Sequence, residues 1–274
     1  MNSRALVPAL LFVFLAASFL TAQQRLGSND NRLAAVLKLP ALTSSDWQTL
    51  FSEAESGNAE AQYWLGRIYA LGILLPKDSE KSNYWFEKSA RQGYLPAEYL
   101  VCEMRTNENR NEVEYHRCVR RAAEHGLPEA QELMGMAYDR RLWFGVKDEQ
   151  AAFNWFKRAA ENGDVDAEVE LGRRYKDGDG VGQSYALAAE WYRKAAEHVP
   201  DLGGAGVARN ELGLLYLDGL GVPKDSVQAY MWLSMSNDAS DVADLRNEMA
   251  PAQLLQAQQM ADAWKRQHPA PAIF

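Results

Sequence analysis

The chain has 274 residues, of which 47% are hydrophobic and 24% charged, a balance typical of a folded protein and not of a disordered one. Its 37 acidic and 29 basic residues give a formal net charge of −8 at pH 7. This excess of acid opposes binding to nucleic acid or anionic lipid, and the sequence has no basic arm, RNA-binding aromatic motif or zinc knuckle to offset it.

Residues 1–22 have the composition of a secretory signal peptide. An apolar run follows the basic Arg4, and small residues near Ala22 suit a cleavage site. We expect cleavage after Ala22; a cut after Ser18 and an uncleaved membrane anchor are the alternatives, because about 18 apolar residues can just span a bilayer. The chain is therefore expected to cross the inner membrane into the bacterial periplasm, and to touch a membrane only if this segment is retained. Residues 23–43 are predicted to be a loose lead-in.

Beyond the lead-in the sequence repeats itself. A Leu-Gly or Met-Gly pair is followed three residues later by Tyr, and then by Asp or Ser, Ala, an aromatic pair and Ala-Ala, with a period of roughly 35 to 41 residues. Such a period is typical of stacked repeats, in which each unit buries its apolar face against its neighbours. The positions predicted to form the repeat core are Leu65, Gly66, Tyr69, Trp85, Phe86, Gly135, Tyr138, Trp155, Phe156, Leu171, Gly172, Tyr175, Trp191, Tyr192, Leu212, Gly213, Tyr216 and Trp232.

Each unit is predicted to be a pair of antiparallel helices. In the first half of a unit, Ala61, Leu65 and Tyr69 are spaced i, i+4, i+8, which is one face of a helix. The aromatic pair and the alanines of the second half form a similar stripe. A residue with a side-chain oxygen stands where the N-cap of each second helix belongs. These predicted caps are Asp78, Asp148, Ser184 and Asp225.

The pattern divides the chain into a series of units with a cap at each end. We expect a half-repeat cap at 44–58, five repeats at 59–93, 94–126, 127–163, 164–207 and 208–238, capping helices at 239–267 and a disordered tail at 268–274. The fourth repeat is expected to carry a loop insertion at 199–206. In the C-terminal cap, Leu254, Ala257, Ala261 and Trp264 share one face of a predicted helix that opens at Pro251.

The repeat at 94–126 keeps the alanines of the pattern but loses most of its other positions. Aligned on those alanines, Cys102 falls where the sister repeats have Gly, and Cys118 falls where they have the Trp of the aromatic pair. If each Gly lies under that Trp, the two cysteines face each other in one hairpin. In an exported chain two cysteines favour a disulfide over a metal site. We predict a Cys102–Cys118 disulfide; two free buried thiols are the alternative.

No metal site or cofactor is predicted. His116 lies about 200° around the helix from Cys118, so the two side chains do not share a face. Asp177 and Asp179 stand beside glycines as in calcium loops, but the further oxygen ligands and closing Glu are missing, and both are expected to be solvated.

The repeat at 127–163 replaces the glycines of the hairpin loop with bulky residues. They are Arg140, Arg141, Trp143 and Phe144. Because Arg and Trp are favoured anchors at protein interfaces, this loop is a candidate protein-binding site. The alternative is that Trp143 and Phe144 fold back over the neighbouring degenerate repeat.

Two segments carry a resemblance to a known family. Residues 176–181 with 188–196, and residues 217–222 with 225–233, resemble the Sel1-like repeat, a relative of the tetratricopeptide repeat, and the similarity covers about residues 44–265. The resemblance implies an all-α fold, namely an α-solenoid of antiparallel helix hairpins in a right-handed superhelix, with a scaffold or adaptor role. Exported members of the family include regulators of envelope signalling and polysaccharide export factors.

The expected function is non-catalytic: a periplasmic scaffold or adaptor for another protein, such as a membrane sensor or an envelope complex. The sequence has no His-Glu-x-x-His, no Gly-x-Ser-x-Gly and no phosphate-binding Gly-rich loop. Two alternatives stay open. One is a hydrolase, because some cysteine-paired members of the family carry a β-lactamase label, although the serine-enzyme motifs are missing here. The other is a structural component of a cell-envelope assembly.

Overall fold

The computed structural model describes residues 44–72, 75–109, 111–140, 147–198, 204–236 and 240–268. Throughout these ranges the protein is all-α and has no strand, as the repeat pattern predicts. The helices are α3 (Ser44–Ser56), α4 (Ala59–Leu71), α5 (Ser79–Arg91), α6 (Leu95–Asn109), α7 (Glu112–Glu124), α8 (Pro128–Asp139), α9 (Glu149–Glu161), α10 (Val165–Asp177), α11 (Tyr185–Ala196), α12 (Ala205–Asp218), α13 (Ser226–Leu233), α14 (Ser240–Glu248) and α15 (Pro251–Gln267). The predictions for residues 1–22, 23–43 and 269–274 lie outside the described ranges.

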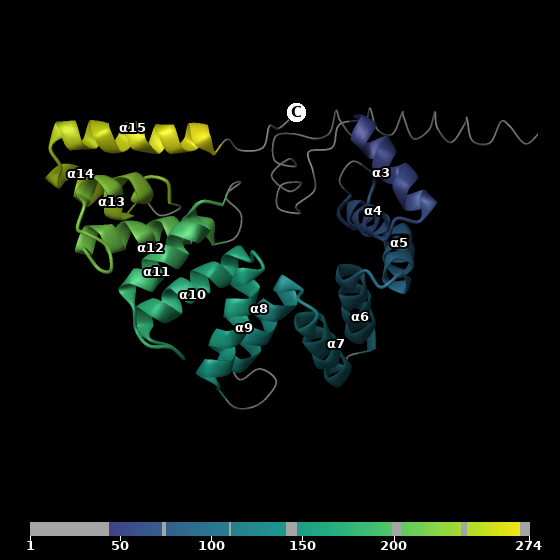
Figure 1. Cartoon of the computed structure of the whole chain (residues 1–274). Helices are drawn as coiled ribbons and strands as arrows, with labels where there is room; N and C mark the ends of the chain where they lie inside the picture. The colour runs from purple at the N-terminus through teal and green to yellow at the C-terminus, as the bar shows by residue number, and fades with distance from the viewer. Residues whose placement is uncertain are drawn as a thin grey trace, which may run out of the picture. The chain divides into compact units, whose positions relative to one another are not determined.

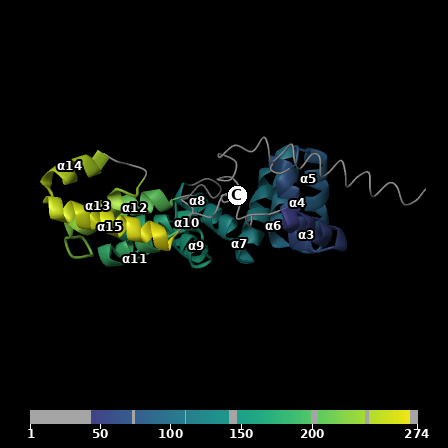
Figure 2. The ribbon, with the colours of Figure 1, turned by 90° about the horizontal axis from the view of Figure 1, so that it is seen from above.

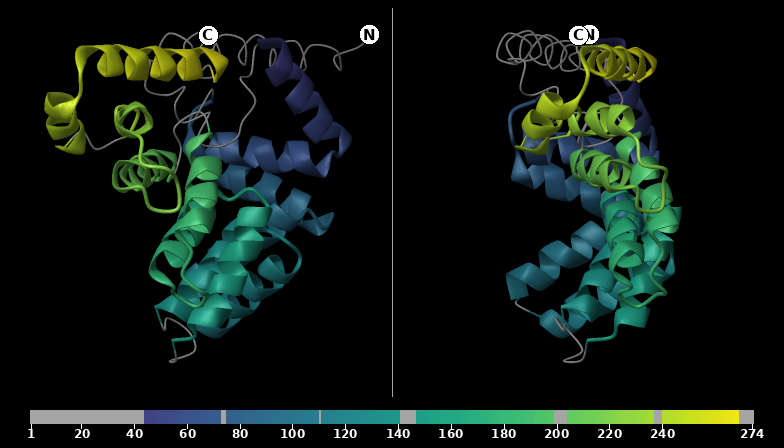
Figure 3. Two further views of the ribbon diagram at one scale, coloured as in Figure 1. Left: turned by 60° about the vertical axis from the view of Figure 1, so that its left-hand side comes forward. Right: turned by 90° about the vertical axis from the view of Figure 1, so that its left-hand side faces the viewer.

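The chain divides into two compact units, with the boundary between Arg110 and Asn111. In the first unit, α3 packs on α4, α4 on α5, and α5 on α6. In the second unit, the hairpins α8–α9, α10–α11 and α12–α13 follow one another, and each hairpin contacts the next (Figures 1 and 3). Helix α15 packs across α13 at the end of this series, as the view from above shows (Figure 2). The architecture is therefore an α-solenoid of helix hairpins.

The second helix of each full repeat begins at the N-cap predicted for it. Asp78, Asp148, Ser184 and Asp225 each accept a hydrogen bond from a backbone N–H of the first helical turn, as Asp148 Oδ1 does from Ala151 N at 2.9 Å. The N–H of each cap residue also donates to the carbonyl of the repeat Tyr at the end of the first helix, over 2.7 to 3.2 Å. These two bonds close the four full hairpins in the same way, which explains why Tyr and the cap residue recur together.

The repeat glycine faces the second residue of the aromatic pair, so the expectation that it lies under the Trp is wrong. A Cβ built on Gly172 would lie only 2.5 Å from the ring of Tyr192. Because glycine has no Cβ, the two helices of a hairpin approach until ring and backbone touch. The facing pairs are Gly66–Phe86, Gly135–Phe156, Gly172–Tyr192 and Gly213–Leu233.

The Trp of the pair packs instead on the preceding hairpin. Trp191 joins the apolar cluster built around α9, and Trp232 joins the cluster built around α11. Trp85 and Trp232 are buried, whereas Trp155 and Trp191 are half-buried. The pair therefore fills two seams, because its second residue lies inside a hairpin while the Trp lies between hairpins.

The predicted disulfide is present: Cys102 of α6 is bonded to Cys118 of α7. The reason differs from the one expected, because Cys118 does not stand at the position that faces the glycine. The next residue, Val119, occupies that position and is fully buried.

The C-terminal helices cover the last hairpin. On α15, Ala257 and Ala261 are buried, and the ring of Trp264 lies 6.1 Å from that of Trp232 in an edge-on arrangement. The predicted shared face of this helix is thus the face that packs on α12 and α13. Among the residues that the structure describes, no helix is both long and apolar enough to cross a membrane.

One boundary differs from the sequence prediction. Helix α12 begins at Ala205, with Gly204 as its N-cap, so the loop insertion expected at 199–206 ends earlier than predicted. The methyl group of Ala205 is fully buried. Packing of this first turn on the preceding hairpin lets the helix begin within the stretch where three glycines indicated a loop.

Candidate functional site

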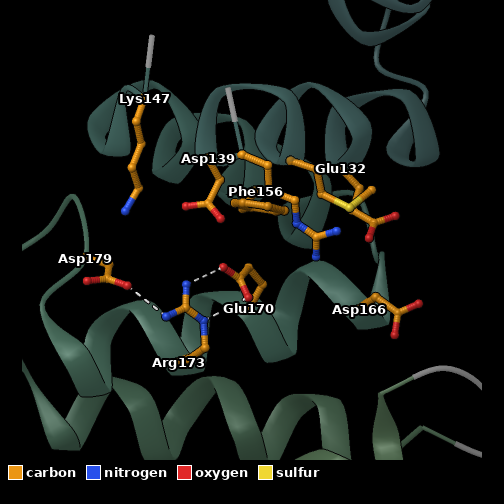
Figure 4. Close-up of a pocket in the computed structure, with 10 residues that line it drawn as sticks. Glu132, Asp139, Lys147, Phe156, Asp166, Glu170, Arg173 and Asp179 are labelled. Carbon is orange, nitrogen blue, oxygen red and sulfur yellow. Dashed lines mark hydrogen bonds and ion pairs between the residues drawn. The ribbon is translucent and has the colours of Figure 1, made fainter. Parts of the chain in front are cut away.

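A charged groove lies between α8 and α10, the first helices of two consecutive repeats in the second unit (Figure 4). Its volume is about 410 Å³. Each helix contributes residues spaced i, i+4, i+7, which is one helical face, and the hairpin loops and α9 complete the lining. From α8 come Glu132, Met136 and Asp139; from α10 come Asp166, Glu170 and Arg173; from the loops come Arg140, Lys147 and Asp179; from α9 comes Phe156.

One end of the groove is a network of paired charges around Arg173. Its guanidinium lies 2.7 Å from Glu170, 2.8 Å from Asp179 and 3.2 Å from Asp177. The hydrogen bond from Arg173 holds the pKa of Asp179 below its usual value. Asp177 and Asp179, which were expected to be solvated, therefore hold Arg173 in place beside the groove.

A second arginine, Arg174, joins the two repeats behind the residues that line the groove. Arg174 is fully buried, and its Nη2 donates to Asp139 Oδ1 of α8 at 2.6 Å. Its Nε lies 3.0 Å from Glu170 Oε1 as an ion pair without hydrogen-bond alignment, and its guanidinium stands 4.9 Å from the centroid of the Phe156 ring. A buried guanidinium with several carboxylate partners fixes the groove walls, because breaking such a pair is costly.

The other end of the groove is acidic. Burial of its carboxyl group raises the pKa of Glu132 to about 7, and the negative charges of Asp164, Asp166, Glu129 and Glu170 act in the same direction. In the described part of the chain no basic side chain forms an ion pair with Glu132 or Asp166. In Figure 4 these two side chains lie together, away from Lys147, Asp179 and Arg173.

Only part of the loop predicted to bind protein lies in the described structure. Arg140 is exposed and lines the groove at the end of α8. Arg141, Trp143 and Phe144 lie outside the described residues, so both interpretations of this loop stay predictions.

The sequence analysis missed the acidic end of the groove. Aligned on the repeat Ala and Gly, Glu132 occupies the position held by Tyr63, Val169 and Asn210 in the sister repeats. A carboxylate in place of an apolar or neutral residue at a position that faces the next repeat is the signal that could have found it. Glu132 is not one of the positions that define the repeat, so the repeat pattern says nothing about it.

The groove presents charged and apolar groups. The lining residues given above include no Ser, Thr, Cys or His, and the carboxylates at one end are bound by arginine. The groove therefore offers fixed charges, two apolar contacts from Met136 and Phe156, and one half-buried carboxyl group that titrates near neutrality.

Comparison with known families gives matches along much of the chain. The family model described as Sel1 repeat matches residues 59–94, 128–164, 165–198 and 206–241, which together are just over half of the chain. The degenerate repeat falls between the first two matches.

Two curated proteins are similar over part of their length. DAP3-binding cell death enhancer 1 of Rattus norvegicus is 30% identical over 164 residues, which are 57% of this chain and 32% of that protein. Chitin synthase regulator SKT5 of Saccharomyces cerevisiae is 27% identical over 161 residues, which are 53% of this chain and 22% of that protein. The matched region thus spans about a third or less of either relative.

Two solved structures resemble the fold. One is c5321, a protective antigen of uropathogenic Escherichia coli strains with an SLR fold, with a TM-score of 0.62 and 31% identity over 80% of this chain and 48% of that chain. The other is a Sel1 repeat protein from Oxalobacter formigenes, with a TM-score of 0.57 and 26% identity over 77% of this chain and 89% of that chain.

Proposed function

Because this chain belongs to the Sel1 repeat family, whose members are generally non-catalytic scaffolds for protein–protein interaction, we propose that it binds another protein through the groove between α8 and α10. The observation that carries the proposal is the groove itself, whose two walls are joined by the buried Arg174 and whose Glu132 forms no ion pair with a basic side chain among the described residues. A binding site gains affinity when its charged groups are held in place before the ligand arrives.

The groove is better suited to binding a polypeptide than to catalysing a reaction. A nucleophile with an adjacent base is the usual sign of a hydrolase, and the lining offers none. The β-lactamase-like alternative thus gains no support from this site. A segment of another protein could contact the whole groove. Its apolar side chains would pack on Met136 and Phe156, and the charges at the two ends of the groove would fix the orientation of the segment.

We further propose that the chain works in the bacterial periplasm, where it holds a membrane sensor or an envelope complex. Two features support this setting: the apolar segment within residues 1–22, and the disulfide between Cys102 and Cys118, which an oxidising compartment would maintain. Sequencing the amino terminus of protein isolated from cells tests the export proposal. A mature terminus at Gln23 is expected, and a cytosolic protein with an intact first segment would contradict it.

Photocrosslinking in living cells tests the groove as the contact site. A photoreactive amino acid replaces Met136 in the groove or, as a matched control, the exposed Asn154 on α9. We expect one dominant adduct from position 136 and none of the same mass from position 154. Mass spectrometry of the adduct then separates a regulatory role, which gives one sensor, from a structural one, which gives several assembly subunits. Equal adducts from both positions, or none from position 136, would contradict binding at the groove.

A further inference from the structure

The sequence contains a single Asn-Gly dipeptide, and it forms the turn between α9 and α10 of the second unit. We propose that Asn162 is a site of spontaneous deamidation, at which water replaces the side-chain amide with a carboxylate, and that the product breaks a buried link to Gln131 of α8. Asn162 does not line the groove between α8 and α10, and its reaction requires only solvent water.

The reaction starts with an attack of the backbone nitrogen of Gly163 on Cγ of Asn162. A bond forms between these two atoms, the attacking nitrogen gives up its proton, and the side-chain nitrogen leaves as ammonia, which closes a succinimide ring. Water then adds to either carbonyl of the ring and opens it to aspartate or isoaspartate. Overall one water is consumed and one ammonia is released. Glycine favours the attack because it has no Cβ to shield its nitrogen.

The reacting residues are open to solvent, and the turn requires the glycine. Asn162 is exposed at the C-cap of α9, and a Cβ built on Gly163 would meet nothing within 4 Å. The φ angle of Gly163 is 86°, in a region that other residues rarely adopt. The fold therefore keeps beside Asn162 the neighbour that makes its side chain reactive.

Two hydrogen bonds engage the reacting groups in the folded turn. Asn162 Nδ2 donates to Gln131 Oε1 at 2.9 Å, and the N–H of Gly163 donates to the carbonyl of Ala160 at 3.1 Å. Both bonds must open before the attack, so the reaction proceeds through local opening of the turn. Two hydrogen bonds of ordinary net strength should slow it roughly 5- to 30-fold relative to an unfolded peptide.

The carboxylate formed at position 162 is unable to keep the link to α8. Gln131 is buried, and its amide serves two partners, since Nε2 donates to the carbonyl of Ala123 at 3.0 Å while Oε1 accepts from Asn162. An ionised carboxylate has no proton to donate to Oε1. If Gln131 turned its amide to donate to the new carboxylate, its oxygen would face the carbonyl of Ala123. One of the two bonds is lost in either arrangement.

The first unit holds the same link with a residue that resists the reaction. Gln92 precedes Gly93 at the end of α5, and its Nε2 donates to Gln62 Oε1 at 2.7 Å. A glutamine has to close a larger ring, which forms far more slowly, so Gln92 should stay unmodified. Glutamine at position 162 is therefore expected to preserve the link and block the reaction.

Mass spectrometry of the full-length protein tests the proposal. The purified chain and a synthetic peptide of residues 158–167 are incubated at pH 8, and samples taken at intervals are digested at low pH, where the reaction is slow. Fragmentation then separates aspartate from isoaspartate. We expect product at Asn162, formed roughly 5 to 30 times more slowly than in the peptide, and none at Gln92.

Three variants separate the reaction from its structural consequence. Asn162→Gln should show no deamidation at this turn and should melt at the same temperature as the unmodified protein. Asn162→Asp, which carries the charge of the product, should melt on the order of 3 °C lower, because a buried hydrogen bond is lost. Gln131→Leu removes the acceptor and should raise the rate at Asn162 towards that of the peptide. If this variant does not fold, urea below the unfolding transition takes its place and should also speed the reaction.

Three results would overturn the inference. The absence of product at Asn162 after many half-lives of the peptide would reject the site. Equal melting temperatures for Asn162→Asp and Asn162→Gln would reject the loss of the link to α8. A rate at Asn162 that neither Gln131→Leu nor urea raises would show that opening of the turn does not control the reaction.

Discussion

At Gly172 the hairpin of the fourth repeat leaves no room for a side chain. A Cβ there would lie 2.5 Å from Cε1 of Tyr192, and that ring is itself fully buried. The ring cannot move aside without displacing its neighbours, so even a methyl group overpacks the seam. Glycine at this position is required by the close approach of two helices, since its φ angle is an ordinary helical one.

We therefore predict that Gly172→Ala destabilises the protein. Overpacking costs about 1–3 kcal/mol, whereas alanine gains only about 1 kcal/mol over glycine in a helix, so the net loss should reach about 2 kcal/mol, because the buried Tyr192 ring puts the overpacking cost at the upper end of its range. Urea denaturation followed by circular dichroism measures the change. Gly182→Ala is the matched control, because a Cβ there meets nothing within 4 Å and should leave stability unchanged or slightly higher. Equal midpoints for the two variants would contradict the packing argument.

Some contacts of single residues could be predicted from the sequence and others could not. The N-caps could be predicted because a cap depends on its own side chain and the next three residues, as with Asp148 and the N–H of Ala151. The partner of the repeat glycine could not. Two adjacent aromatic residues both lie on the stripe that periodicity indicates, and only the packed hairpin shows that the second one meets the glycine.

At the scale of helices, one buried polar position joins each repeat to the helix before it. This position follows the first-helix alanine, and its side chain donates to a carbonyl at the end of the preceding helix, where backbone oxygens lack intrahelical partners. The three bonds, each 3.0 Å, join Gln62 to Ala54, Gln131 to Ala123 and Arg209 to Ala196.

Glu168 holds the same position in α10, but an ionised carboxylate cannot donate. Lys194 of α11 provides the donor instead, with its Nζ 3.1 Å from the carbonyl oxygen of Ala160 and 3.0 Å from Glu168 Oε1. His198 Nε2 lies 3.1 Å from the second carboxylate oxygen. Since Glu168 is fully buried, these partners are what make its charge tolerable.

A double-mutant cycle tests this arrangement. Lys194→Met removes the cation and leaves a buried carboxylate, so we predict a loss of about 3 kcal/mol in the free energy of unfolding. Adding Glu168→Gln should restore most of it, because the new amide can donate to Ala160 as Gln62 donates to Ala54. Urea unfolding of both single variants and the double variant gives the coupling energy. A double variant no more stable than Lys194→Met would show that the lysine acts in some other way.

The helix pattern predicted the hairpins but not this connection. Lys194 and Ala160 are 34 residues apart, and nothing in the local sequence of α11 distinguishes Lys194 from an exposed lysine. The same holds for Arg174, which reads as a surface residue of an amphipathic helix yet is fully buried between α8 and α10. Charged residues are rarely fully buried, so sequence reasoning places them outside unless a partner is known.

At the scale of the whole molecule, stability is distributed along the series of hairpins. In the second unit each hairpin contacts chiefly its neighbours, and α15 covers the last one. Trp264 of α15 packs against Trp232, stands over the guanidinium of Arg209 at 5.0 Å, and stacks on His268 with ring centroids 4.3 Å apart. Capping elements of this kind close the apolar end of a stacked-repeat protein.

We predict that Trp264→Ala loosens the end of the second unit and spares its beginning. Truncating a fully buried Trp costs about 3–5 kcal/mol, so the half-buried Trp264 should cost roughly 2–3 kcal/mol, and nearest-neighbour coupling confines most of that loss to the adjacent hairpin. Hydrogen exchange read by mass spectrometry should show lost protection in α12 and α13 and unchanged protection in α8 and α9. Leu255→Ala on the exposed side of the same helix is the control. Uniform loss of protection would mean that the unit unfolds as one body.

The sequence by itself determined the features that depend on local spacing: an all-α chain, helix hairpins with their caps, and the Cys102–Cys118 disulfide. It also showed the family to which the chain belongs, because the repeat positions recur at fixed offsets. Only the tertiary structure decided the groove, the buried Arg174 that joins its two walls and the acidic end at Glu132. Those features arise when side chains more than 30 residues apart are brought together by the stacking of two repeats, as the 2.6 Å bond from Arg174 to Asp139 shows. Both the burial of these side chains and the charges around them require two stacked repeats. A single repeat therefore could not produce their chemistry.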